Sequence, residues 1–281
     1  MNLLAKTKQI CRSLNFKPER AKGQNFLIDE NVYETIIAAA DLKPDDRILE
    51  VGPGLGFLTA RLAAASRQVT AVELDGRLAD YLAVAAKAKK ISNLEIIKGD
   101  ILRANLEDFK AEPYKIVANL PYNITSIFLR QFLGGARKPE SLVLLLQKEV
   151  AERIVARPPE MSLLAVSVQY YGRPEIVAGV PAAAFWPRPA VASAVIKIET
   201  FSSGTEREDE KEEKSFFRVV KIGFSARRKM LKNNLAAGLK ITPARAESAL
   251  EKSGLNPQAR AQDLNLQDWR KLFVALKDFV V

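Results

Sequence analysis

The 281-residue sequence contains no histidine and a single cysteine, Cys11. A Ser-His-Asp triad therefore cannot be built, and one cysteine supports neither a disulfide within the chain nor a cysteine-rich zinc site. We expect no metal site. No apolar run approaches the length of a transmembrane helix, and the first residues lack the apolar core of a signal peptide. Together with the lone thiol, which suits a reducing compartment, these absences predict a cytoplasmic protein with no membrane partner.

Acidic residues are outnumbered by basic ones, at 33 Asp and Glu against 43 Lys and Arg. The resulting net charge of +10 favours a polyanionic partner, with nucleic acid ahead of an anionic membrane surface. A protein that is merely basic is the alternative, since charge alone does not decide between them. The hydrophobic fraction of 48% fits a folded chain of one large domain or two ordinary ones.

Strand-like and helix-like patterns alternate through the first half of the chain. Apolar runs that predict strands lie at 47–51, 68–72, 93–97, 115–118 and 141–146, with helical patterns at 57–66, 76–90 and 148–156. This alternation predicts an α/β fold with a mostly parallel, Rossmann-like sheet, whose ligand site lies beyond the carboxyl ends of the strands. The residues expected at those ends are Gly52, Glu73, Asp100 and Asn119.

The pattern changes after Pro158-Pro159. Residues 162–171 and 192–199 are interpreted as strands that add an antiparallel edge to the sheet. A charged run at 206–214 indicates a linker, and only helical patterns follow it. We therefore predict an α/β domain at 1–203 with an N-terminal extension, a charged linker at 204–214, and a small all-α domain at 215–281.

A glycine-rich turn, Gly52-Pro-Gly-Leu-Gly56, follows the first predicted strand. Glycines between a strand and a helix let a ligand approach the backbone closely, and a nucleotide cofactor is the obvious ligand. The third glycine comes one place too early for the dinucleotide fingerprint, and a tight turn with no ligand is the alternative. Gly52 and Gly54 are therefore candidate cofactor-binding residues that need support from elsewhere in the chain.

Two carboxylates supply that support. Glu73 ends the second strand about 20 residues beyond the glycines, where an acidic residue can accept hydrogen bonds from both ribose hydroxyls. Asp100 follows the third strand and could accept from an adenine amino group. Considered singly, Glu73 could be a solvated charge and Asp100 a helix cap or an Asx turn. Together with the glycines they indicate an adenosine site, and the lack of nearby basic residues favours a ligand without phosphates, such as S-adenosylmethionine.

The turn Asn119-Leu120-Pro121-Tyr122 follows the fourth strand. The Asn119 side-chain oxygen and the Leu120 carbonyl could accept both N–H bonds of an aromatic amine, which aims the nitrogen lone pair at a methyl donor. Tyr122 could stack on one face of the base, and Phe185 is the candidate for the other. Methyl transfer by in-line displacement needs alignment rather than a strong base, so the lack of histidine is no obstacle. Such a base must be unpaired or flipped out.

A basic segment, Phe224-Ser-Ala-Arg-Arg-Lys-Met-Leu-Lys232, lies in the C-terminal part. Clusters of this kind contact phosphates, although a solvated helix face is an equal alternative. The candidate RNA-binding residues are Arg227, Arg228, Lys229 and Lys232.

These segments together resemble the ribosomal RNA adenine N6,N6-dimethyltransferase family over nearly the whole chain. The resemblance rests on the order of motifs at 23–27, 50–59, 72–75, 99–100, 119–122, 185–195 and 224–229. It implies that Asn25 and Leu27 help to bind S-adenosylmethionine, with Gly52, Glu73, Asp100 and Asn119 in the same site. Leucine at position 120 and the basic segment resemble the small-subunit branch, which dimethylates two adjacent adenines near the 3′ end of small-subunit rRNA.

The resemblance leaves two alternatives and one local departure. The antibiotic-resistance branch, which acts on large-subunit rRNA, more typically has isoleucine in place of Leu120. A non-catalytic RNA-binding assembly factor would have no need of Glu73, Asp100 or Asn119. The departure is at 157–163, which lacks the usual glycine and tyrosine and puts the shape of that loop in question. We expect a monomer whose partner is small-subunit rRNA within a ribosomal subunit or an assembly intermediate.

Overall fold

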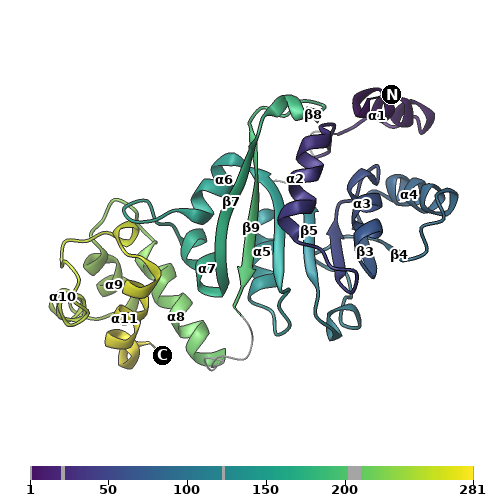
Figure 1. Ribbon diagram of the computed structural model, residues 1–281. Helices are drawn as coiled ribbons and strands as arrows, with labels where there is room; N and C mark the ends of the chain where they lie inside the picture. The colour runs from purple at the N-terminus through teal and green to yellow at the C-terminus, as the bar shows by residue number, and fades with distance from the viewer. Residues whose placement is uncertain (1, 20–22, 122–123, 202–209, 281) are drawn as a thin grey trace. The chain divides into compact units, whose positions relative to one another are not determined.

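The computed structural model describes residues 2–19, 23–121, 124–201 and 210–280 (Figure 1). The chain divides into two compact units, each with its own core. The first unit comprises 1–151 and 173–201, and the second comprises 152–172 and 202–281.

A seven-stranded sheet forms the centre of the first unit (Figure 1). Its first five strands in spatial order are parallel to their neighbours, whereas β9 runs antiparallel to β6, which confirms the predicted fold class. In spatial order the strands are β4 (Leu94–Lys98), β3 (Gln68–Glu73), β2 (Arg47–Val51), β5 (Lys115–Asn119), β6 (Ser141–Gln147), β9 (Ser193–Thr200) and β7 (Gly172–Val180).

Short helices connect these strands, and aspartate side chains cap the first turn of two of them. Asp29 accepts a hydrogen bond from the Asn31 amide at the start of α2, and Asp75 accepts one from the Arg77 amide at the start of α4. A separate two-stranded pair joins β1 (Phe26–Leu27) to β8 (Phe185–Trp186). The helices are α1 (Leu3–Ser13), α2 (Glu30–Ala40), α3 (Phe57–Ala65), α4 (Gly76–Ala88), α5 (Thr125–Leu133) and α6 (Lys148–Val155), with short 3₁₀ turns at Phe109–Ala111 and Ala182–Ala184.

The central strands carry unbroken apolar runs because helices cover both faces of a parallel sheet. Leu142, Leu144 and Leu146 point to one face of β6 and Val143 and Leu145 to the other, and all five are buried. Such a sheet is rigid, and it fixes the positions of the loops that leave its carboxyl edge.

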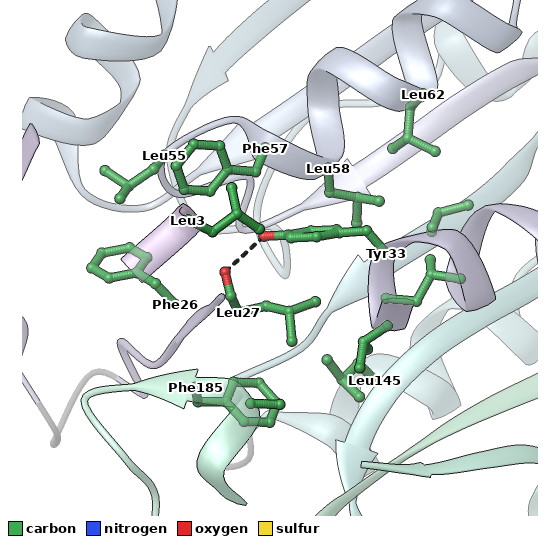
Figure 2. Packing of buried hydrophobic residues seen from close by; sticks show 14 of the residues in the cluster. Leu3, Phe26, Leu27, Tyr33, Leu55, Phe57, Leu58, Leu62, Leu145 and Phe185 are labelled. Atoms are coloured by element: carbon green, nitrogen blue, oxygen red, sulfur yellow. Dashed lines mark hydrogen bonds between the residues drawn. The ribbon is translucent and has the colours of Figure 1, made fainter. Parts of the chain in front are cut away.

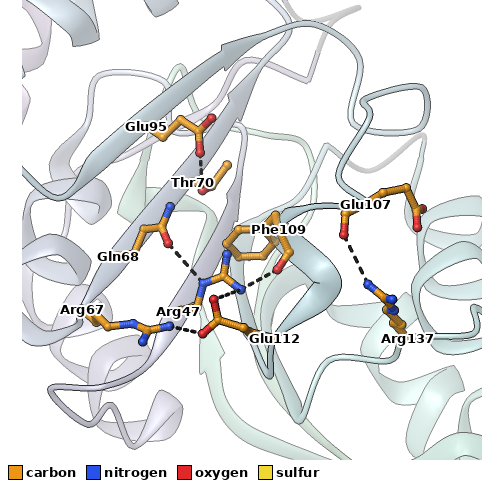
Figure 3. A network of polar contacts seen from close by, with 9 residues as sticks. All are labelled: Arg47, Arg67, Gln68, Thr70, Glu95, Glu107, Phe109, Glu112 and Arg137. Carbon is orange, nitrogen blue, oxygen red and sulfur yellow. Dashed lines mark hydrogen bonds and ion pairs between the residues drawn. The ribbon is translucent and has the colours of Figure 1, made fainter.

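Arg47 anchors the opposite edge of the sheet (Figure 3). Its guanidinium is buried, donates to the Gln68 side chain at 3.1 Å and to the Phe109 carbonyl at 2.6 Å, and lies 4.5 Å from the centroid of the Phe109 ring. Glu112 forms ion pairs with Arg47 and Arg67. Because Arg47 begins β2 while the glycine-rich turn follows its end, this network stabilises the fold away from the predicted site.

One predicted strand is wrong, since residues 162–171 contain helix α7 (Leu163–Tyr171). The Ser162 hydroxyl accepts a hydrogen bond from the Ala165 amide at 3.1 Å and caps this helix. Valines and tyrosines favour strands in isolation, but packing of the helix overrides that weak preference. The edge strand is instead β7, which contains Pro174 and Gly179 and so gave little strand signal.

Helices and the turns between them make up the described part of the second unit, apart from Gly172, which begins β7. Its core includes an aromatic cluster in which the ring of Tyr170 lies 5.0 Å from that of Phe216 and 4.8 Å from that of Phe217. This packing explains why 152–172, expected in the first domain, groups with the C-terminal helices. Of the predicted linker, 204–209 lie outside the described residues and 210–214 instead begin α8. The remaining elements are α8 (Glu210–Gly223), α9 (Leu231–Leu239), α10 (Pro243–Lys252), α11 (Leu266–Leu276) and 3₁₀ turns at Ala261–Asp263 and Lys277–Phe279.

Candidate functional site

A pocket of about 820 Å³ opens at the carboxyl ends of the parallel strands of the first unit. The topology dictates this position, because loops that leave neighbouring parallel strands meet at the same edge. The structure brings every residue predicted to bind a cofactor to the lining of this one pocket. Those residues are Asn25, Leu27, Gly52, Gly54, Glu73, Asp100 and Asn119.

The glycine-rich turn forms one wall of the pocket. Gly54 has a φ of +56°, which is the left-handed region, and a Cβ there would lie 3.2 Å from the Phe26 ring. Gly56 has a φ of +74°, and a Cβ there would lie 2.4 Å from the Leu82 side chain. Both positions therefore require glycine, one beside the pocket and one where α3 and α4 approach each other.

Glu73 joins the end of β3 to this turn. One carboxylate oxygen accepts from the Gly54 amide at 3.0 Å and the other from the Asp75 amide at 2.9 Å. The side chain is 6% exposed, and burial raises the pKa of Glu73 while these two hydrogen bonds oppose the rise. Each oxygen retains a second lone pair, so a ligand diol could still be accepted.

Glu50 is a pocket residue that the sequence reasoning quoted within a motif without giving it a role. It lies in β2, is 1% exposed, and its Oε2 has no hydrogen-bond partner among the described residues. Burial raises the pKa of Glu50 to about 8, the nearby Thr59 hydroxyl opposes the rise, and the charge of Glu73 adds to it. A carboxylate inside an otherwise apolar strand, two places before Gly52, was the signal that could have revealed it.

Asn119 is held in a defined orientation at the end of β5. Its side-chain amide donates to the Asn25 carbonyl at 3.3 Å, which links the strand end to the segment before β1. Leu120 is buried and its backbone amide donates to the Leu145 carbonyl at 3.3 Å, so the start of the turn is tied to β6. Tyr122 lies outside the described residues.

Phe185 does not lie on the pocket surface in this structure. Its side chain is 3% exposed and belongs to the hydrophobic core, where β8 pairs it with Leu27 of β1 (Figure 2). The Tyr33 hydroxyl donates to the Leu27 carbonyl at 3.0 Å and fixes the same segment. Phe185 therefore lies in the core opposite Leu27, which is a different position from the base-stacking one expected for it.

Asp100 forms an Asx turn, which was the alternative considered for it, and it also lies at the pocket as expected. One oxygen accepts a hydrogen bond from the Leu102 amide at 3.0 Å, as in an Asx turn. The side chain also lines the pocket, so its second oxygen is the one that could face a ligand.

Charges around the pocket are mainly negative. The expectation that no basic residue lies nearby was wrong, because Arg77 lines the pocket. Its guanidinium is engaged, however, since it forms an ion pair with Asp75 at 3.4 Å and lies 4.7 Å from the centroid of the Phe16 ring. The acidic lining residues are Glu50, Glu73, Asp75, Asp80 and Asp100. This balance suits a cationic ligand and disfavours a phosphate.

The basic segment of the second unit is a turn between α8 and α9. Arg227, Arg228 and Lys229 are exposed there, whereas Lys232 forms an ion pair with Glu247 at 2.9 Å and links α9 to α10. The buried side chain of Asn234 donates to the carbonyls of Gly223 at 2.7 Å and Ala226 at 3.1 Å. Asn234, which the sequence reasoning missed, thereby fixes the turn.

Comparison with known proteins identifies the family. The sequence model described as "Ribosomal RNA adenine dimethylase" matches residues 15–278. A Dehalococcoides mccartyi protein named "Ribosomal RNA small subunit methyltransferase A" is 45% identical, over 96% of this chain and 92% of that protein. A Clostridium botulinum protein of the same name is 38% identical, over 98% and 99% of the two chains.

Solved structures agree with the fold. The crystal structure of the 23S rRNA methyltransferase ErmE is 29% identical, covers 90% of this chain and 100% of that one, and has a TM-score of 0.73. A dimethyladenosine transferase from Plasmodium falciparum has a TM-score of 0.79 at 23% identity, over 90% of this chain and 98% of that one, which supports the fold alone. Since the family model spans nearly the whole sequence, the chain belongs to the ribosomal RNA adenine dimethylase family.

Proposed function

We propose that this protein is an S-adenosylmethionine-dependent enzyme that dimethylates N6 of two adjacent adenines near the 3′ end of small-subunit rRNA during ribosome biogenesis. The observation that carries the proposal is the pocket at the carboxyl edge of the sheet, which gathers seven residues from five separate segments of the chain. The named relatives at 36–45% identity support the small subunit as the substrate. We expect the protein to act in the cytoplasm as a monomer.

The pocket residues fit S-adenosylmethionine chemically. Glu73 presents two carboxylate oxygens whose remaining lone pairs suit a ribose diol, and the second oxygen of Asp100 suits an adenine amino group. The excess of carboxylates along the lining suits the positive charge of a sulfonium donor. When bound, this cofactor supplies an electrophilic methyl group.

Asn119 would position the adenine amine. Because its Nδ2 is committed to the Asn25 carbonyl, its Oδ1 remains available to accept an N–H bond. With the Leu120 carbonyl accepting the second N–H, the lone pair of the amine would point along the line of attack. Glu73 and Asp100 would hold the donor so that its methyl group lies on this line, and the methylated nitrogen would afterwards lose a proton to solvent. Such alignment can contribute roughly 7–11 kcal/mol to lowering the barrier.

In the second unit, Arg227, Arg228 and Lys229 would contact rRNA phosphates, because they are exposed on a turn that Asn234 holds in place. Lys232 is a weaker candidate, since its charge is already paired with Glu247. Tyr122 and Phe185 remain proposed only as residues near the base, and the buried position of Phe185 favours an indirect role.

Methylation of large-subunit rRNA is the competing function, because ErmE shares the fold at 29% identity. The deciding experiment incubates the protein with isotopically labelled S-adenosylmethionine and unmodified small or large ribosomal subunits, and then maps the labelled bases by mass spectrometry. We expect two adjacent dimethyladenines near the 3′ end of small-subunit rRNA. Label on large-subunit RNA alone would favour the competing function, and no label on either would favour an assembly factor without catalysis.

A further inference from the structure

The second unit contains an open groove of about 700 Å³ that lies wholly within this unit. Residues from α6, α7, α8, α9 and the turn after α8 form its walls. The lining residues that matter for its chemistry are Arg153, Leu163, Arg218, Lys221, Phe224 and Arg227. Four of these six are cationic, and no acidic residue lies among the described residues that line the groove.

The four cations are free to bind an anion. Within the described part of the chain, none of Arg153, Arg218, Lys221 and Arg227 forms an ion pair or a side-chain hydrogen bond, and all four are exposed. Lys232 in the same unit differs from these four, because it forms an ion pair with Glu247 that links two helices. Unpaired cations gathered in one concavity repel each other, and that repulsion is relieved when a polyanion binds.

Helix geometry explains why the cations converge. Arg218 and Lys221 are three residues apart and therefore share one face of α8, whereas Phe216, Val219 and Val220 are buried on the other face. Gly238 of α9 lets the two helices approach, because a Cβ there would lie 2.3 Å from the Ile222 side chain. The groove is thus part of the packed fold and does not depend on a mobile loop.

Apolar surface distinguishes this groove from a simple basic patch. Leu163 is 37% exposed, and the ring of Phe224 is half-buried with its centroid 5.5 Å from that of Trp269. Cations beside apolar surface suit a nucleic-acid strand, whose phosphates need positive charge while its sugars and bases offer apolar faces.

We propose that this groove binds an RNA strand through Arg153, Arg218 and Lys221, and so forms a second phosphate-binding surface beside the turn at Arg227–Lys229. The inference rests on the proposed function, because the RNA is taken to be the small-subunit rRNA. It adds three residues that the basic motif does not contain. It also predicts that affinity for the substrate is spread over the groove as well as the exposed turn, with Arg227 common to both.

The test uses full-length protein and a triple variant, Arg153→Gln, Arg218→Gln and Lys221→Gln. Its matched control, Lys240→Gln, Lys252→Gln and Lys271→Gln, removes the same charge from exposed positions outside the groove. Binding to small ribosomal subunits is measured at several potassium chloride concentrations. We expect the slope of log affinity against log salt to fall by about 2–3 for the groove variant, since each lost phosphate contact removes roughly 0.7–0.9. The control should change the slope by less than about 1.

Three further measurements separate the possible outcomes: methylation by the wild-type protein, binding to protein-free rRNA, and cofactor affinity. Equal slopes for the groove variant and its control would overturn the groove proposal, whereas failure of the wild-type protein to methylate small-subunit RNA would overturn the proposed function instead. If the groove variant lost affinity for intact subunits but bound protein-free rRNA normally, the occupant would be a ribosomal protein and the RNA proposal would be wrong. Unchanged S-adenosylmethionine affinity in both variants, measured by calorimetry, is expected because the cofactor pocket belongs to the other unit.

Discussion

The carboxylate of Glu73 accepts a hydrogen bond from the Gly54 amide at 3.0 Å, so the end of one strand holds the glycine-rich turn that follows another. The two residues are far apart in the sequence, but β3 is paired with β2 in parallel, which places Val72 opposite Val51. The glycine-rich turn and Glu73, each of which has two interpretations in the sequence, therefore form one wall of the pocket. This contact makes Glu73 both a candidate ligand-binding residue and a support for the turn.

Replacement of Glu73 by glutamine should weaken S-adenosylmethionine binding roughly 10- to 100-fold, because hydrogen bonds to a charged group are worth about 1.5–3 kcal/mol. A glutamine side chain has one acceptor oxygen, whereas the Gly54 and Asp75 amides now donate to two separate oxygens of Glu73. Isothermal titration calorimetry measures the change. Glu95→Gln is the control, since Glu95 is exposed, bonds the Thr70 hydroxyl and lies outside the pocket lining. Equal affinities for the two variants would exclude a direct role for Glu73.

Replacement of Asn119 by alanine should abolish methyl transfer while leaving affinity for the ribosomal subunit within about twofold of wild type. The physical reason is that Asn119 would orient the amine through Oδ1, whereas phosphate contacts in the other unit would supply most of the affinity. Single-turnover rates and subunit binding are the two measurements. Asn119→Asp keeps an acceptor but loses the donor to the Asn25 carbonyl, and it should retain more activity than alanine. Near-normal turnover by Asn119→Ala would contradict the mechanism.

Glu50 should make the stability of the ligand-free protein depend on pH. Burial raises its pKa to about 8 from an ordinary 4.5, so the native state keeps a proton that the unfolded chain releases. The free energy of unfolding should therefore fall by up to about 1.4 kcal/mol for each pH unit as the pH rises from about 5 to 8. Above pH 8 it should level off. Glu50→Gln should flatten this slope in urea unfolding curves recorded at pH 5, 6, 7 and 8. Identical slopes for wild type and variant would show that Glu50 does not titrate in this range.

Asn234→Ala should destabilise the second unit by about 1–3 kcal/mol, because two buried carbonyls, those of Gly223 and Ala226, lose their side-chain donor. The loosened turn should also lower affinity for small ribosomal subunits. Urea unfolding followed by tryptophan fluorescence reports the first effect when it is recorded in a Trp186→Phe background, where Trp269 is the remaining tryptophan. Asn233→Ala, at the exposed neighbouring position, is the matched control. If Asn234→Ala lowered the stability without lowering the affinity for subunits, the hydrogen bonds of Asn234 would stabilise the fold but would not contribute to RNA binding.

The course of the chain through the sheet could be predicted because strands buried on both faces have unbroken apolar runs and the turns that end them are rich in glycine, proline and asparagine. Residues 162–171 were assigned wrongly because valine and tyrosine favour strands weakly, and only packing of Tyr170 against Phe216 decides for a helix. The same kind of long-range packing buries Phe185 behind Leu27, which no local pattern could show.

By itself the sequence determined the residue types and their order: glycines after one strand, carboxylates after two others, and Asn119 after a fourth. Tertiary structure decided what these residues contact. It gave Lys232 a partner in Glu247 while leaving Arg218 and Lys221 unpaired among the described residues. Within the same described ranges, it also left the Oε2 of Glu50 without a hydrogen-bond partner, and the charge of Glu73 acts on this carboxyl group. The reason is that desolvation and charge pairing depend on neighbours distant in the chain, and these neighbours are fixed only when the elements pack.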